Sequence, residues 1–296
     1  MNLQIHREAG MTERPVAGHV RVAGVQMDPA IGDAEQNLET SLFAMTKARA
    51  QGANLIVFPE CSLTGYCFSD AEEAARAALE RKGVIVRGIH EAAAKMGVVC
   101  VVGYIERTAS GLANTVSMLG PDGAEAHYRK THLPHLGGDR FVEQGNEPPP
   151  VVEARGIRVG LQICYDASFP EATRLLALAG ADLVVLPTNW PQEAEAKALW
   201  LPNARAYENV IYFASVNRVG SEGGFDFHGM SRICDPEGKT LVEAPRDAEV
   251  ILLADVDPVR ARTKRIERRE GYWLDRIEQR REDLYRLTPV PGRENP

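Results

Sequence analysis

Three side chains that together could carry out acyl transfer stand at the ends of predicted strands. Cys164 ends an apolar stretch, Glu60 follows the run Ile-Val-Phe-Pro, and Lys130 follows Ala-His-Tyr-Arg. A thiol can attack a carbonyl carbon, a carboxylate can take the thiol proton, and an ammonium can stabilise the resulting oxyanion. Singly, each has an ordinary interpretation, as a core thiol, a paired buried carboxylate and a surface lysine. Together they would suffice for cysteine chemistry without histidine, if the fold brings them together.

The elements that must position these side chains are short β-rich runs alternating with Ala-rich stretches of helical periodicity. This alternation predicts an α/β protein with helices covering a sheet. The predicted strands cover residues 19–27, 53–58, 98–106, 114–120, 156–164, 181–187 and 209–219, with a late hairpin at 230–244. The predicted helices cover residues 33–51, 70–81, 86–96, 170–179 and 199–208.

One pattern occurs twice along the chain. Residues 52–59 (GANLIVFP) resemble residues 180–187 (GADLVVLP), and each follows a strand with Arg-Val and Gln and then a helix. Generic βαβ units can match this well by chance, but two similar halves packed as a pseudo-symmetric sandwich is the favoured interpretation. It places Glu60 and Cys164 just past the carboxyl ends of buried strands, where α/β sheets gather their functional groups.

Composition and local segments predict how the chain is divided into domain, leader and tail. We expect a flexible leader over residues 1–20, a single domain over 21–286 and a tail over 287–296. The run Glu147–Pro150 is a stiff elbow too short to separate independent domains. Residues 260–286 carry ten basic and six acidic side chains, or 10 − 6 = +4. A solvated C-terminal helix or a subunit contact is favoured there over a nucleic-acid arm.

Charge and cysteine usage exclude several classes of protein. The 296 residues include 34 Lys and Arg against 41 Asp and Glu, a net charge of −7, and 44% are hydrophobic. An acidic globular chain is not expected to bind nucleic acid or an anionic membrane, and no apolar run is long enough for a bilayer. The N-terminus lacks the apolar core of a signal peptide. The cysteines are five and irregularly spaced, which favours free thiols in a reducing cytoplasm and offers no metal site.

An ordered set of short motifs resembles the nitrilase superfamily of carbon–nitrogen hydrolases. The motifs are Phe58-Pro59-Glu60, Tyr128-Arg129-Lys130 and Ile163-Cys164-Tyr165-Asp166, followed by residues 187–191, 205–209, 217–220, 227–231 and 280–285. The resemblance covers nearly everything from Arg21 to Tyr285. It implies a four-layer αββα sandwich with Glu60 as general base, Cys164 as nucleophile and Lys130 stabilising the oxyanion together with the backbone N–H of Tyr165. It further implies no metal or organic cofactor, and a homodimer or larger homo-oligomer.

The chain departs from the family pattern at one carboxylate. Many members carry a further glutamate seven residues before the glycine of a Phe-x-Pro-Gly-like turn. If that glycine is Gly145, the position falls on Gly138, next to Asp139. Asp139 could serve with a shorter reach, or Glu143 from a differently routed loop. Asp139 is the favoured choice, and an exposed loop carboxylate is the alternative interpretation of both.

The residues after the nucleophile bear on the substrate. Nitrile-hydrolysing members typically continue Cys-Trp-Glu and D-carbamoylases Cys-Asn-Asp, whereas this chain continues Cys164-Tyr165-Asp166 and resembles the amidase branches. We therefore expect hydrolysis of a small-molecule amide, with an N-carbamoyl amine or amino acid as the second choice. A nitrilase, a glutaminase module in a complex and a catalytically silent binding protein remain as alternatives.

Candidate substrate-binding residues are Tyr66, His132, Tyr165, Asn189 and Trp190. Tyr66 and Trp190 could equally be packing aromatics, and His132 is expected to be a structural hydrogen-bonding residue. We expect Arg205, Glu208 and Asn209 to tie a helix to the sheet.

Overall fold

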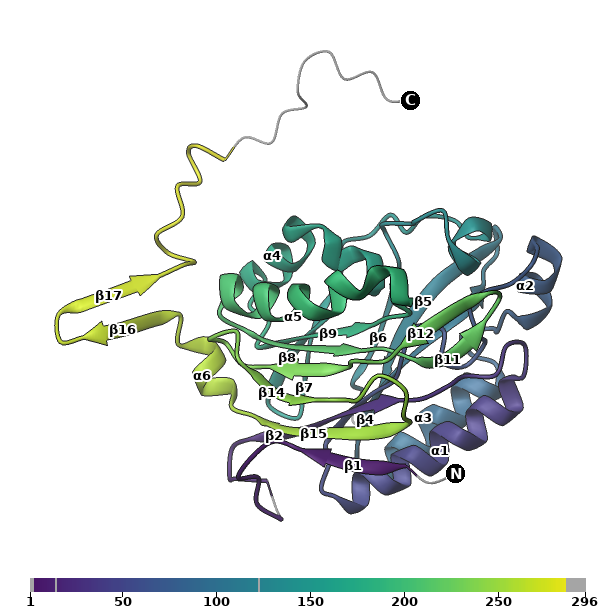
Figure 1. The fold of residues 1–296 in the computed structure, drawn as a ribbon, viewed down its shortest axis with the longest axis horizontal. Helices are drawn as coiled ribbons and strands as arrows, with labels where there is room; N and C mark the ends of the chain where they lie inside the picture. Colours follow the sequence, from purple (N-terminus) through teal and green to yellow (C-terminus); the bar gives the residue numbers. More distant parts are fainter. Residues whose placement is uncertain (1–2, 14, 122, 286–296) are drawn as a thin grey trace.

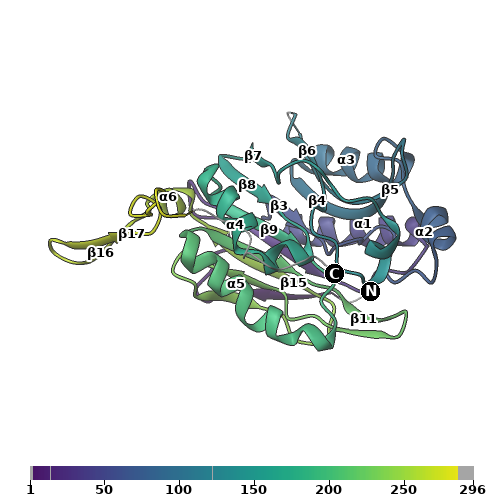
Figure 2. The ribbon, with the colours of Figure 1, turned by 90° about the horizontal axis from the view of Figure 1, so that it is seen from above.

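The computed structural model describes residues 3–13, 15–121 and 123–285. Two sheets pack face to face, and helices cover the outer side of each sheet (Figures 1 and 2). Among these residues the first sheet has the order β1 (Gln4–Arg7), β15 (Val250–Val256), β2 (Val20–Gln26), β3 (Leu55–Val57), β4 (Val99–Arg107), β5 (Leu112–Leu119) and β6 (Glu125–Arg129). The second has the order β14 (Thr240–Glu243), β13 (Arg232–Cys234), β10 (Tyr212–Val216), β9 (Leu183–Pro187), β8 (Ile157–Leu161) and β7 (Val151–Ala154).

The two sheets repeat one topology. Strands β2, β3 and β4 are mutually parallel and continue into antiparallel β5 and β6. Strands β8, β9 and β10 are likewise parallel and continue into antiparallel β13 and β14. An antiparallel strand also lies on the other side of each parallel set, β15 beside β2 and β7 beside β8. The prediction of two pseudo-symmetric halves is confirmed.

The layers follow from side chains that alternate along each strand. In β2, Val22 packs in the core shared by the two sheets, whereas Ala23 and Val25 pack on the other face, under helices α1 (Ala34–Ala50) and α3 (Val84–Met96). Helices α4 (Pro170–Leu178) and α5 (Glu195–Asn209) cover the second sheet (Figure 2). The result is the four-layer αββα sandwich.

Local sequence signals account for the helix ends. Asp33 caps α1, its carboxylate accepting the backbone N–H of Gln36, and α3 ends at Gly97 with a left-handed φ of +65°. Helix α2 (Ala71–Ala77) is shorter than predicted because Leu79 leaves the helix and pairs with β4, donating its N–H to the carbonyl of Ile105 at 2.9 Å.

The predicted flexible leader is wrong for part of its length. Strand β1 pairs in parallel with β15, so residues 4–7 are an edge strand of the first sheet. The segment between β1 and β2 is held by Arg21, whose guanidinium donates to the carbonyls of Thr12 and Glu13 and pairs with Asp255 at 2.8 Å. A polar edge strand carries little apolar signal of its own, which explains the error.

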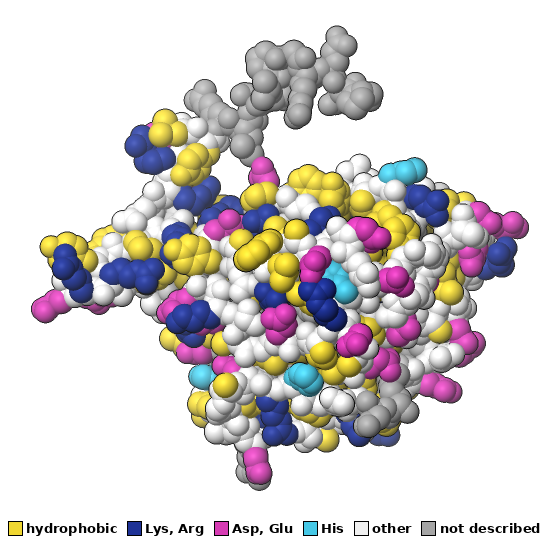
Figure 3. Space-filling view, viewed as in Figure 1, with side chains coloured by type: hydrophobic (Ala, Val, Ile, Leu, Met, Phe, Trp, Pro, Cys, Tyr) yellow, Lys and Arg dark blue, Asp and Glu magenta, His cyan; other side chains and the backbone are white. Residues whose placement is uncertain are grey.

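A C-terminal helix is also absent over most of residues 260–285. After the short helix α6 (Pro258–Arg262), strands β16 (Arg265–Arg269) and β17 (Tyr272–Asp275) form a hairpin arm that extends away from the sandwich (Figure 1). Gly271 makes the turn with φ +78°. Guanidinium groups lie over aromatic rings along the arm, Arg265 over Trp273 at 4.2 Å and Arg269 over Tyr272 at 4.0 Å, and Figure 3 shows basic and hydrophobic side chains side by side there. The predicted tail, 287–296, lies outside the described residues.

Candidate active site

The three side chains singled out by their types stand where strands end. Glu60 is the third residue after β3, Cys164 is the third residue after β8, and Lys130 directly follows β6. Strands β3 and β8 belong to the two parallel sets but do not correspond to each other. Strand β8 repeats β2 and strand β9 repeats β3, so the residue that corresponds to Glu60 in the other half is Thr188. The sequence prediction of strand-end positions for these residues is confirmed.

The chain turns sharply at both places. Cys61 (φ +51°) and Cys164 (φ +42°) are in the left-handed region, which costs a residue other than glycine about 1–3 kcal/mol and persists only where the surroundings enforce it. Asp166 enforces the turn at Cys164, its carboxylate accepting the backbone N–H of Ile163 and the hydroxyl of Tyr128, both at 2.9 Å. At the other turn, a Cβ on Gly103 would lie 2.5 Å from the backbone nitrogen of Cys61, so only glycine fits on β4 there.

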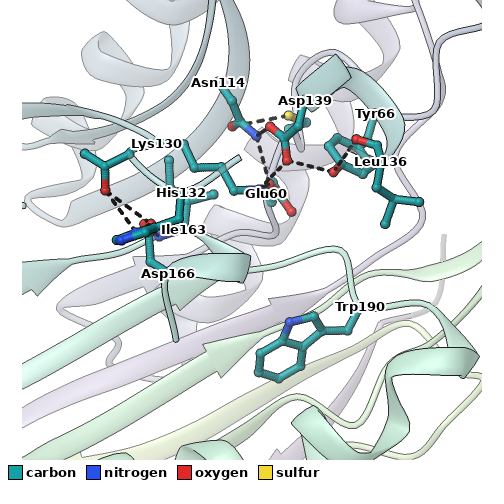
Figure 4. A network of polar contacts seen from close by, with 12 residues as sticks. Glu60, Tyr66, Asn114, Lys130, His132, Leu136, Asp139, Ile163, Asp166 and Trp190 are labelled. Carbon is teal, nitrogen blue, oxygen red and sulfur yellow. Dashed lines mark hydrogen bonds and ion pairs between the residues drawn. The ribbon is translucent and has the colours of Figure 1, made fainter. Parts of the chain in front are cut away.

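Lys130 joins two carboxylates in a buried cluster. Its Nζ lies 2.7 Å from Glu60 Oε1 and 2.5 Å from Asp139 Oδ2, and all three side chains are fully buried (Figure 4). Asp139 lies on the short 3-10 helix η1 (Gly137–Phe141). Glu143, the other candidate, is exposed and accepts a hydrogen bond from Ser110 at 2.7 Å. The loop therefore brings Asp139, and not Glu143, to Lys130.

Two neutral side chains complete the cluster. Asn114 on β5 donates from Nδ2 to Glu60 Oε1 and to Asp139 Oδ1, both at 2.8 Å, and the hydroxyl of Tyr66 donates to Asp139 Oδ2 at 2.8 Å. A Cβ on Gly137 (φ +52°) would lie 2.3 Å from the Tyr66 ring, so glycine is needed for this contact. Asn114 was not among the predicted site residues, and β5 also carries the buried polar residues Thr115 and Ser117, so no local signal singled it out.

The electrostatics of the cluster keep Lys130 charged. Burial alone would lower the pKa of Lys130, but the carboxylates of Asp139 and Glu60 raise it well above its usual value. Burial, together with Asp139, raises the pKa of Glu60, against the charge of Lys130 and the hydrogen bonds from Lys130 and Asn114. One oxygen, Glu60 Oε2, is buried and has no hydrogen-bond partner among the described residues.

The Cys164 thiol lies within electrostatic reach of this cluster. Burial raises the pKa of Cys164 to about 12 and the charge of Glu60 adds to the rise, whereas Lys130, Thr188 and Asn189 oppose it. At neutral pH the thiol therefore holds its proton and needs a base before it can attack. Cys164 is buried, with 7% of the residue surface exposed.

The predicted substrate-binding residues fall into two groups. Tyr66 and His132 form hydrogen bonds within the protein. The single O–H of Tyr66 is shared between Asp139 Oδ2 and the carbonyl oxygen of Leu136, 3.0 Å away, and His132 Nδ1 lies 2.7 Å from Asp166 Oδ1. Asn189 and Trp190 follow β9, and the carboxamide of Asn189 and Nε1 of Trp190 are buried without a hydrogen-bond partner in the described part of the chain.

Tyr165 stands apart from the cluster. It is half-buried, its ring packs edge-on against Phe169 at 5.2 Å, and Lys197 Nζ lies 4.7 Å from the ring centre. The segment after Cys164 is tied to α5 by Arg205, which donates to the carbonyl of Ala167 at 3.0 Å and pairs with Glu208 at 2.9 Å.

Within residues 3–13, 15–121 and 123–285, no group of three or more His, Cys, Asp or Glu side chains is arranged to hold a metal ion. No helix in those ranges has the length and apolar character needed to cross a bilayer. All five cysteines are free and buried.

Known proteins resemble this chain over most of its length. Residues 21–266 match the sequence model of the carbon–nitrogen hydrolases. A nitrilase of Pyrococcus abyssi is 34% identical over 261 residues, covering 88% of this chain and 98% of the relative. An (R)-stereoselective amidase of Pseudomonas sp. is 33% identical over 250 residues, covering 82% and 87%. A solved mutant amidase from Nesterenkonia sp., with the acetamide moiety of fluoroacetamide added covalently at its active-site cysteine, is 29% identical with a TM-score of 0.72, covering 85% and 95%.

Proposed function

We propose that this chain, which belongs to the carbon–nitrogen hydrolase family, hydrolyses a small-molecule amide to an acid and ammonia or an amine through a thioester on Cys164. The observation that carries the proposal is the buried Glu60–Lys130–Asp139 cluster within electrostatic reach of a protonated thiol, with one oxygen of Glu60 unpartnered among the described residues. The covalent adduct at the active-site cysteine of the Nesterenkonia amidase supports a nucleophilic cysteine in this fold.

In the acylation half, Glu60 takes the proton of the Cys164 thiol as sulfur bonds to the amide carbon. The carbonyl oxygen becomes an oxyanion, which Lys130 Nζ and the backbone N–H of Tyr165 stabilise. The C–N bond then breaks, and Glu60 returns the proton to the leaving nitrogen. The products of this half are ammonia or an amine and a thioester.

In the deacylation half, Glu60 is again a carboxylate and takes a proton from a water that attacks the thioester carbon. The C–S bond breaks, the acid leaves, and the proton returns from Glu60 to the sulfur. The carboxylate thus needs to be ionised at the start of each half, and the buried pair with Lys130 supports that charge.

Asp139 acts in this proposal through Lys130. Its carboxylate holds the ammonium at 2.5 Å, and the Tyr66 hydroxyl holds the carboxylate in turn. Asp139, Tyr66 and His132 are therefore positioning residues, His132 through Asp166 and the turn at Cys164.

The Asn189 carboxamide and Trp190 Nε1 are proposed to bind the substrate. Both are buried polar groups with no hydrogen-bond partner in the described chain, a state that costs free energy unless a ligand satisfies them. Tyr165 is proposed to line the approach to Cys164.

The test is ammonia release from a panel of aliphatic amides, ω-amides, glutamine, N-carbamoyl amines and amino acids, and nitriles, with Cys164→Ala beside the wild type. Amide turnover that disappears in the variant supports the proposal. Turnover of N-carbamoyl compounds or nitriles alone would retain the mechanism and overturn the substrate class. Silence across the panel would favour a binding protein on this fold.

We also propose a homo-oligomer in a reducing cytoplasm. Apolar side chains are exposed on α4, α5 and the hairpin arm: Leu175, Leu178, Trp200, Tyr207, Tyr272 and Trp273. Exposed apolar surface of this kind favours association, and the free thiols favour the compartment. Light scattering of the wild type and of Trp200→Glu tests the oligomer, which should be smaller in the variant if this face is an interface.

A further inference from the structure

Asn114 is a neutral side chain placed between two carboxylates. It is buried on β5, and its two amide hydrogens are donated to Glu60 Oε1 and Asp139 Oδ1. Because carboxylates only accept, the NH2 group must face them and the amide oxygen must face away. That oxygen lies 3.7 Å from the Cys61 sulfur, which can donate to it. The orientation of the carboxamide is thus determined on both sides.

This arrangement gives the two carboxylate oxygens of Glu60 different hydrogen-bond surroundings. Oε1 accepts from both Lys130 and Asn114, at 2.7 and 2.8 Å. Oε2 is equally buried but accepts from no side chain or backbone group in the described ranges. An oxygen that already accepts two hydrogen bonds is a poorer proton acceptor than one that accepts none, and a buried bare oxygen is costly to keep.

We infer that Asn114 is a positioning residue that engages Oε1 of Glu60, so that Oε2 is the oxygen that moves the proton. The inference rests on the proposed function and deepens it. Lys130 alone would leave the carboxylate of Glu60 free to rotate about that one contact. Two donors on the same oxygen, both of them also bound to Asp139, determine the plane of the carboxylate.

The charge of Glu60 depends on the same contact. A hydrogen bond from the Asn114 amide favours the ionised carboxylate without adding a charge of its own. The titratable groups that interact electrostatically with Glu60 are Lys130, Asp139, Cys164, Tyr66, Cys61 and Cys67. Losing the amide donor therefore raises the pKa of Glu60 further, although Lys130 still favours the ionised carboxylate.

The test measures alkylation of Cys164 by iodoacetamide as a function of pH, with the modified residue located by peptide mass spectrometry. Asn114→Leu removes both donors at similar size, and Asn114→Asp keeps the shape but replaces the donors by a charge. Ser117→Ala is the matched control, a buried polar residue of the same strand that bonds Tyr104 and His127 instead. Melting temperatures establish which variants are folded.

The inference predicts that the midpoint of the alkylation curve moves to higher pH by about one unit in Asn114→Leu, and further in Asn114→Asp, since a hydrogen bond to a charged group is worth about that much. With a substrate, kcat should fall about tenfold or more while KM changes by less than about threefold. Ser117→Ala should leave both unchanged. A merely structural role would lower the melting temperature without moving the curve.

Curves of folded Asn114 variants that superimpose on the wild-type curve would overturn the inference. If Asn114→Leu does not fold, Asn114→Asp decides alone. Alkylation needs no substrate, so a failure of the proposed amidase function can be told apart from a failure of the inference about Asn114. A wild type that hydrolyses no amide but shows the shift in the variants refutes the amidase and supports the role of Asn114.

Discussion

Replacing Asp139 by asparagine tests whether the carboxylate beside Lys130 supports the chemistry. Asp139 accepts three hydrogen bonds, from Lys130 and Tyr66 on Oδ2 and from Asn114 on Oδ1. A carboxamide has one oxygen, so whichever way it turns, its NH2 group faces a donor. The substitution therefore loses at least one contact to a charged group and leaves Lys130 with Glu60 as its single carboxylate partner in the described site.

The size of the effect follows from that loss. A hydrogen bond to a charged group contributes about 1.5–3 kcal/mol, and each 1.36 kcal/mol is a factor of ten in rate. If the loss is felt at the oxyanion, kcat falls about 10- to 160-fold. KM should change little, because Asp139 contacts Lys130 and not the amide that reacts.

The assay is steady-state hydrolysis of the best amide of the panel, with urea unfolding to confirm a folded variant. Glu143→Gln is the matched control, an exposed carboxylate of the same loop whose change should alter kcat by less than about twofold. Wild-type kcat in Asp139→Asn would show that the carboxylate of Asp139 does not support the reaction. A larger loss of kcat in Glu143→Gln would indicate that Glu143 supports it instead.

Two further predictions follow from the buried charges. Burial raises the pKa of Glu60, and the base must be ionised to act. The value of kcat/KM should therefore rise with pH through a midpoint above 4.5, the ordinary pKa of a glutamate carboxyl. A pH–rate profile that is flat or falls there would contradict the assignment of Glu60 as the base. Arg21→Gln leaves the largely buried Asp255 without its ion pair and removes the hydrogen bond from Arg21 to the carbonyl of Glu13. The free energy of unfolding in urea should therefore fall by about 3–5 kcal/mol. The exposed ion pair of Arg281 with Asp283 supplies the control: Arg281→Gln should cost less than about 0.5 kcal/mol, and an equal loss in the two variants would argue against the anchoring role of Arg21.

The sequence predicted the places of Glu60 and Cys164 because a strand end is a local property. Each follows an apolar run bounded by Gly-Ala or Tyr-Asp, and both signals are within a few residues of the side chain. Lys130 also directly follows a strand, β6, but its burial could not be inferred, because the partners of its ammonium come from the turn after β3 and from η1.

What the sequence could not settle depends on contacts between distant segments. Asp139 and Glu143 were both open because the loop route is set by Gly137 against the Tyr66 ring, from another part of the chain. Strand β1 was missed because its partner β15 is near the other end of the chain. A solvated helix or a subunit contact was expected for the C-terminal arm from its charge content, and the helix is wrong for residues 265–275. The alternation of Arg265, Ile266 and Glu267 before Gly271 was a hairpin signal.

In the proposed reaction Cys164 carries the acyl group as a thioester. Intact-protein mass spectrometry of the enzyme mixed with an amide substrate and quenched in acid within the first turnovers tests it directly. We expect a mass increase equal to the acyl group, located on Cys164 by peptide mapping. The increase should be absent from Cys164→Ala and retained in Cys100→Ala, whose thiol lies in the core between the first sheet and its helices. An acyl group on another residue, or amide turnover that survives in Cys164→Ala, would contradict it.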